Sequence, residues 1–238
     1  MSTVFERYFG LLDSDESDPD ERFETFFAPD AEVFYGGEYA AGEWIIPFHR
    51  RLATRRQHSA HTSFVTADAD GVVTADWQET GEDSHGRAYE AGGTATAWLD
   101  ASGRITRLKV LYADHSDLAW RVIRAHNQAW RETDPDERQT LIKDAYAEDF
   151  TFVEHYVVEG RDACSEWVAK IHEAAPVALL QVGEVLRNRD DVLWQWFLAM
   201  PDSTEVEGWE TQHVDVNGKI DRIVVITRDM ETIVGGAS

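Results

Sequence analysis

Hydrophobic positions in the second half of the chain follow first a helical and then a strand period. Over residues 118–130, apolar residues recur every three or four positions, which indicates an amphipathic helix. A second helix is expected to begin at residues 133–135, because cap residues, a proline in the first turn and the acids that follow all favour a helix start. Its buried face is expected to contain Leu141, Ile142, Ala145 and Tyr146.

The rest of this half predicts one more helix and several strands. Residues 150–158 are rich in aromatic and β-branched side chains and predict a strand, and residues 163–174 predict a helix with Asp162 as its cap. Further strands are placed at 178–186, 192–200, 206–215 and 220–228, with hairpin turns at 188–191 and 216–219. The last turn contains Asn-Gly, a strong hairpin signal. Helices gathered on one face of a mostly antiparallel sheet give an α+β fold class.

Alternation within residues 192–200 indicates that both faces of this sheet are covered. One face carries Val192, Trp194, Trp196 and Leu198, and the other carries Leu193, Gln195 and Phe197. A sheet with one face in water would show a polar residue at every second position. We therefore expect helices on one face and a second sheet of the same kind on the other.

The same pattern occurs twice along the chain. Residues 100–110 (DASGRITRLKV) reappear as residues 215–225 (DVNGKIDRIVV), an offset of 115 positions. At nearly the same offset, Trp77-Gln78 matches Trp194-Gln195. Such a period is too long for solenoid repeats of roughly 20–50 residues and suits two copies of one domain. We predict two tandem domains, residues 1–117 and 118–238, with copy-one turns at 68–71 and 101–103.

Composition excludes several classes of partner. The formal net charge is −23 and there are only four lysines, so the surface repels nucleic-acid phosphates and anionic lipid. Either a high-salt cytoplasm or a GC-rich genome would explain this composition. The acidic segment 13–21 is expected to be a solvated loop rather than a metal site.

Targeting and redox signals favour a cytoplasmic protein. No apolar run approaches the ~20 residues of a membrane helix. The first residues show no secretory signal pattern. The single Cys164 cannot form an intramolecular disulfide and fits a reducing compartment.

An ordered set of short motifs points to a family. The set comprises Tyr146-Ala-Glu-Asp149, Glu154-His155, the run Glu159-Gly-Arg-Asp-Ala163 with Trp167, and the last hairpin. In duplicate, this set resembles the nuclear transport factor 2-like superfamily, in particular its SnoaL-like branch. Copy one departs from it where Tyr35-Gly36-Gly37 replaces Glu154-His155-Tyr156.

The resemblance implies a curved, mostly antiparallel sheet wrapped into a cone and closed by about three helices around an apolar cavity. Relatives usually dimerise through their sheets, so a tandem chain would form this pair internally, as a monomeric pseudo-dimer or at most a weak homodimer. Members of the superfamily include isomerases, polyketide cyclases, epoxide hydrolases, dehydratases and non-catalytic binders. The fold therefore leaves the function open.

Polar residues on apolar strands are the candidate catalytic groups. Glu154 and His155 supply a carboxylate and an imidazole, the usual acid/base groups, but neighbours alternate and only one can point inward. His155 matches the position at which some SnoaL-like cyclases carry a functional histidine; the alternative is a histidine at a sheet edge. Glu210 and His213 interrupt another strand on opposite faces, and the alternative for both is the interface between the domains.

Copy two is expected to carry any catalysis, because copy one has Gly36, Ala95 and Trp98 where copy two has ionisable groups. The residues expected to bind substrate are Trp194, Trp196, Trp209, Tyr156 and Trp167 in copy two and Tyr35, Trp77 and Glu79 in copy one. His49, His58 and His61 fit no common metal-ligand spacing and lie among arginines, so we expect no metal.

Two functions remain open. One is a cofactor-independent isomerase, cyclase or hydrolase that acts on an apolar small molecule by acid/base chemistry. The other is a non-catalytic small-molecule-binding or scaffold protein of the same fold. An ionisable group at an apolar pocket would favour the enzyme.

Overall fold

The computed structural model describes residues 3–13, 20–54, 56–83, 88–113 and 118–227. The chain separates into two compact units, Met1–His115 (unit 1) and Ser116–Ser238 (unit 2). Each unit combines helices with a mixed sheet. Within the described ranges, no helix has the length and apolar character needed to cross a membrane.

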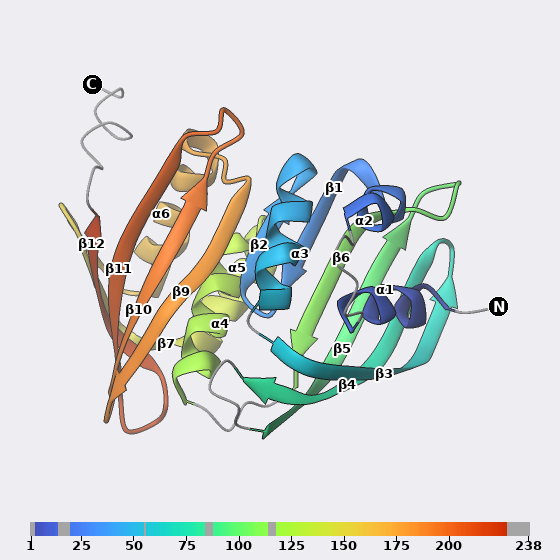
Figure 1. Cartoon of the computed structure of the whole chain (residues 1–238). Helices are drawn as coiled ribbons and strands as arrows, with labels where there is room; N and C mark the ends of the chain where they lie inside the picture. Colours follow the sequence, from blue (N-terminus) through green and yellow to red (C-terminus); the bar gives the residue numbers. More distant parts are fainter. Residues whose placement is uncertain (1–2, 14–19, 55, 84–87, 114–117, 228–238) are drawn as a thin grey trace. The chain divides into compact units, whose positions relative to one another are not determined.

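Unit 1 begins with two helices and continues with strands around a third (Figure 1). Its helices are α1 (Val4–Leu12), α2 (Asp20–Phe26), the short 3-10 helix η1 (Gly42–Trp44) and α3 (Ile45–Thr54). Its strands are β1 (Phe27–Tyr35), β2 (Glu38–Ala41), β3 (Arg56–Ala69), β4 (Val72–Asp83), β5 (Ala88–Leu99) and β6 (Ile105–Tyr112).

Unit 2 repeats this order. Its helices are α4 (Leu118–Arg131), α5 (Pro135–Ala145) and α6 (Arg161–Ala174). Its strands are β7 (Tyr146–Val153), β8 (Val157–Glu159), β9 (Leu179–Asn188), β10 (Asp191–Ala199), β11 (Glu205–Val214) and β12 (Ile220–Thr227). As expected, Asp134 caps α5 by accepting hydrogen bonds from the backbone N–H groups of Asp136 and Glu137.

The two sheets have the same strand order. In unit 1 the order is β3-β4-β5-β6-β1-β2, and in unit 2 it is β9-β10-β11-β12-β7-β8. In each unit the first strand pairs in parallel with the last one, β1 with β6 and β7 with β12, while its other ladders are antiparallel. The two units therefore share one strand order and one pattern of parallel and antiparallel pairing.

The prediction of one continuous strand over residues 150–158 is wrong in the middle of this range. β7 ends at Val153 and turns back on itself as β8, with the Glu154 N–H donating to the Tyr156 carbonyl oxygen at 2.9 Å. Gly36 and Gly37, both at positive φ, make the corresponding turn between β1 and β2. Tyr146, expected on the buried face of a helix, instead begins β7.

The alternation expected within residues 192–200 is confirmed from Val192 to Phe197, but Leu198, expected on the face of the tryptophans, is half-buried, and Ala199 is buried instead. Val192, Trp194 and Trp196 are buried, while Leu193, Gln195 and Phe197 between them are only half-buried. The buried set lies on the face that contacts a helix, because the Trp194 ring is 6.1 Å from the ring of His126 on α4.

Candidate active site

A buried carboxyl group, Glu210 on β11, is the centre of the candidate site in unit 2. Its side chain is only 4 % exposed. Its Oε1 accepts a hydrogen bond from Gln212 Nε2 at 2.6 Å, and His126 Nε2 lies 3.5 Å from the same oxygen. Along β11, buried and half-buried residues alternate, which places Glu210 and Gln212 together on one face.

Glu210 is a neutral acid at pH 7. Burial raises the pKa of Glu210 from 4.5 to about 8, because a carboxylate loses its hydration there. The hydrogen bond from Gln212 lowers the pKa in part, and the negative charge of Glu154 raises it further.

His126 is the neutral neighbour of this acid. Burial lowers the pKa of His126 from 6.5 to about 3. Its Nδ1 is 2.8 Å from the Tyr146 hydroxyl, which accepts a hydrogen bond from Trp130 Nε1 at 2.9 Å. An indole N–H only donates, so the tyrosine proton is left for His126 Nδ1 and the ring proton lies on Nε2, toward Glu210.

Aromatic rings connect this buried pair to a half-buried carboxylate. Ring centroids lie 5.3 Å apart for Trp130 and Phe152, 6.2 Å for Phe152 and Tyr156, and 4.2 Å for Tyr156 and Trp167. The Tyr156 hydroxyl donates to Glu154 Oε2 at 2.6 Å. Burial, followed by this bond, raises the pKa of Tyr156 and keeps its proton in place. Unit 2 therefore brings Glu210, Glu154, Tyr156 and Trp167 into one connected region.

Two of the predicted tryptophans form the sheet wall of this region. Trp194 is 1 % exposed and lies directly across the ladder from Glu210. Trp196, on the same face, lies over Gly208, where an added Cβ would be 2.3 Å from the indole ring. Glycine is required at position 208 because only a residue without a side chain leaves room for this ring.

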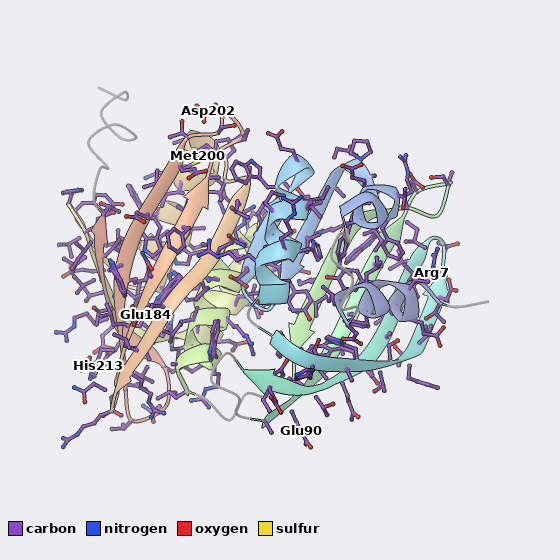
Figure 2. The ribbon with its side chains drawn as sticks, viewed as in Figure 1. Arg7, Glu90, Glu184, Met200, Asp202 and His213 are labelled. Atoms are coloured by element: carbon purple, nitrogen blue, oxygen red, sulfur yellow. The ribbon has the colours of Figure 1, made fainter. Side chains whose placement is uncertain are left out.

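Three predicted residues do not join the cluster. His155 is exposed in the turn between β7 and β8, because the chain reverses there instead of continuing as a strand. His213, near the end of β11 (Figure 2), lies on the face opposite Glu210, where its Nδ1 is 2.6 Å from Asp221 Oδ1. Trp209 alternates with Glu210 in the same way and is half-buried on the face of His213.

The residues predicted in copy one also come together. Trp77 and Tyr35 are each 2 % exposed, and both rings contact Tyr112, at 4.8 and 6.1 Å. Glu79 is 1 % exposed and accepts a hydrogen bond from the Tyr89 hydroxyl at 2.5 Å. His61 lies beside them, with its ring 6.1 Å from Trp77 and its Nε2 3.6 Å from Glu79 Oε2.

The sequence comparison of the strands suggested that unit 1 has few ionisable groups. The structure shows instead that several lie close together there. His61 Nδ1 is also 2.5 Å from Asp13 Oδ1, so two carboxylates flank one imidazole. Asp13 is the described start of the segment expected to be a solvated acidic loop; residues 14–19 lie outside the described part. His49 is a core residue, with its ring nitrogens 2.9 Å from the Tyr8 hydroxyl and 2.7 Å from the Ile45 carbonyl oxygen.

Sequence reasoning missed His126 and Asp13, and it considered His61 only as a metal ligand. A signal existed for His126, because it falls three and four positions after Ile123 and Val122 and thus on the apolar face of its helix. His61 lies on a strand that is half-exposed at alternate positions, and Asp13 is 48 residues away, so nothing in the local pattern joins them. Among the described residues, no group of three or more His, Cys, Asp or Glu side chains is arranged to hold a metal ion.

Comparison with known proteins gives structural similarity alone. A scan against models of known families found no match, and a search of curated proteins found none either. A SnoaL-like family protein from Agrobacterium tumefaciens is 20 % identical, with a TM-score of 0.43, over 47 % of this chain and 98 % of its own. A nuclear transport factor 2-like protein of unknown function from Exiguobacterium is 24 % identical, with a TM-score of 0.43, over 48 % and 100 %.

A third solved structure has a ketosteroid isomerase-like fold. This protein, from Catenulispora acidiphila, is in complex with trimethylamine and is 19 % identical, with a TM-score of 0.40, over 48 % of this chain and 89 % of its own. In all three cases the match covers about half of this chain.

Proposed function

We propose that unit 2 is the active site of a cofactor-independent enzyme in which neutral Glu210 donates a proton to an apolar small molecule. The observation that carries this proposal is a carboxyl group, 4 % exposed, whose pKa is raised to about 8 and whose Oε1 accepts a hydrogen bond from Gln212 Nε2 at 2.6 Å. A neutral carboxylic acid near pH 7 is an effective general acid toward a carbonyl or alkoxide oxygen.

The surroundings of Glu210 favour proton transfer rather than simple storage of a proton. Once Glu210 has lost its proton, the carboxylate keeps the Gln212 bond and faces the Nε2–H of His126, 3.5 Å away. The donor series Trp130, Tyr146 and His126 fixes that N–H in place. Donors that are already aligned stabilise developing negative charge without reorganisation.

Glu154 is the base in this proposal. Its carboxylate accepts a hydrogen bond from the Tyr156 hydroxyl at 2.6 Å, is half-buried, and is close enough to Glu210 for its charge to raise the pKa of Glu210. A base that removes a proton from carbon and an acid that protonates oxygen together perform an isomerisation or the closing step of a cyclisation. The surrounding tryptophan and tyrosine rings suit an apolar, aromatic substrate.

The test is α-proton exchange in deuterated water. Apolar cyclic ketones are incubated with the protein, binding is followed by tryptophan fluorescence, and loss of the α-proton signal is followed by NMR. We expect exchange by the native protein, about 10²–10⁴-fold slower exchange with Glu210→Gln, and no change with His155→Ala. Binding without any exchange would favour the alternative, a non-catalytic small-molecule-binding protein.

A further inference from the structure

We propose that unit 1 contains a second, chemically different catalytic site, in which His61 activates water for the hydrolysis of small uncharged esters. The site consists of Asp13 at the end of α1, His61 on β3 and Glu79 on β4. It shares no residue with the Glu210 cluster, so this proposal can be tested independently of the function proposed for unit 2.

Asp13 fixes the orientation of the His61 ring. One carboxylate oxygen is 2.5 Å from His61 Nδ1 and 3.2 Å from Ser59 Oγ, and the other accepts the His61 backbone N–H at 2.7 Å. Phe9 stacks on the ring, with centroids 4.7 Å apart and planes 9° from parallel. A bulge between Gln57 and Ala60, in which His58 has a φ of 51°, precedes this part of the strand. Bulges commonly re-aim side chains beside active sites.

The hydrogen bond to Asp13 determines which ring nitrogen is basic. A carboxylate only accepts, so the proton of neutral His61 lies on Nδ1 and the lone pair lies on Nε2. The side chain is 0 % exposed, and Nε2 is buried with no hydrogen-bond partner among the residues described. Buried acceptors are rarely left unpaired in folded proteins, and a catalytic role or a bound water accounts for such exceptions.

Glu79 supplies a second acceptor beside this nitrogen. Its Oε2 is 3.6 Å from His61 Nε2, too far for a direct hydrogen bond, while its Oε1 is held by the Tyr89 hydroxyl at 2.5 Å. Gly81 leaves room for that hydroxyl, since a Cβ there would be 2.9 Å from it. Two acceptors at this separation fit one molecule that donates two hydrogen bonds, and water is the smallest such molecule.

With His61 Nε2 as the base, ester hydrolysis proceeds in two proton transfers. A proton of the bound water moves to His61 Nε2 as the water oxygen bonds to the ester carbonyl carbon. The imidazolium, stabilised by Asp13, returns the proton to the alcohol oxygen as the carbon–oxygen bond of the ester breaks, which releases an acid and an alcohol. Two carboxylates repel anions, and Phe9 and Trp77 provide apolar contacts, so the expected substrates are uncharged and apolar. Asp13 is 22 % exposed and marks the solvent side of the site.

The first test is hydrolysis of 4-nitrophenyl acetate by the whole protein. We expect His61→Ala to lower kcat/KM by about 10²–10³-fold. Asp13→Asn, which changes a positioning residue, should lower kcat and displace the pH profile of the reaction. His213 is the matched control, because it also pairs with an aspartate, at 2.6 Å, but is 36 % exposed. His213→Ala and His155→Ala should leave the rate unchanged. A rate that is equal in the native protein and in folded His61→Ala overturns the proposal.

The second test does not depend on how well the variants fold. Long-range proton–nitrogen NMR of the histidines in the native protein at pH 8 identifies the protonated ring nitrogen. We expect neutral His61 to carry its proton on Nδ1, the minor tautomer of free histidine. A proton on Nε2 overturns the proposal, because that nitrogen then has no lone pair for water.

Discussion

Glu210→Gln should stabilise the protein while it abolishes proton transfer in unit 2. The pKa of Glu210 is about 8 in the folded chain, against 4.5 for the unburied group. Between these values the unfolded chain releases a proton that the folded chain keeps, so the free energy of unfolding falls as pH rises. Each pH unit in this window lowers the free energy of unfolding by about 1.4 kcal/mol. The loss therefore amounts to roughly 3 kcal/mol by pH 7.

The amide in Glu210→Gln cannot ionise, so the variant should escape this loss. We expect the two proteins to have the same stability at pH 4, the variant to be about 3 kcal/mol more stable at pH 7, and the difference to level off above pH 8. Urea unfolding across this pH range measures the difference directly.

The matched control for this experiment is Glu184→Gln. Glu184 is exposed on β9 of the same unit (Figure 2), and its replacement removes the same formal charge from the chain. Glu184→Gln should change the free energy of unfolding only slightly, and this change should not depend on pH in the range over which Glu210 keeps its proton only in the folded chain. A stability difference for Glu210→Gln that does not change between pH 4 and pH 8 would refute the reasoning, because burial would then not hold the proton on Glu210.

Three further predictions concern packing, charge and assembly. Gly208→Ala should destabilise the protein by about 1–3 kcal/mol, because the new Cβ would be 2.3 Å from the Trp196 ring. Gly10→Ala in α1 should stabilise the protein, because a Cβ there would have nothing within 4 Å. Urea unfolding compares the two variants. A formal charge of −23 should make the melting temperature rise from dilute to molar salt, and an unchanged melting temperature would contradict this. We also expect a monomer by light scattering, because the duplication supplies two units in one chain; an obligate tetramer would contradict this.

The order of the elements could be predicted from the sequence because each depends on local signals. The caps of α5, the Asn217-Gly218 turn and the alternation in β10 all act over a few residues, and all are present in the structure. The turn at 154–156 was missed because its aromatic and β-branched neighbours favour a strand, and nothing local indicates that the chain reverses there.

The candidate sites were predictable only in part, for a related reason. Glu210 was visible as a polar residue on an apolar strand, and Glu79 was expected to bind substrate; both side chains are buried. Their partners come from other elements: His126 from α4, and Asp13 from the end of α1. Such pairs depend on how a helix packs against a strand, which one sequence does not encode in any short pattern.

The parallel pairing of the first and last strand in each unit has a consequence for biosynthesis. β1 stays without its β6 neighbour until residue 112 has been made, but unit 1 is then complete before any of unit 2 follows, so synthesis separates the two folding events in time. Refolding from denaturant removes this order and offers β1 two similar partners, Ile105-Thr-Arg107 and Ile220-Asp-Arg222. We expect such mispairing to appear as a slow refolding phase whose rate is independent of protein concentration. Refolding without a slow phase at any concentration would show that the two copies distinguish their own strands from the start.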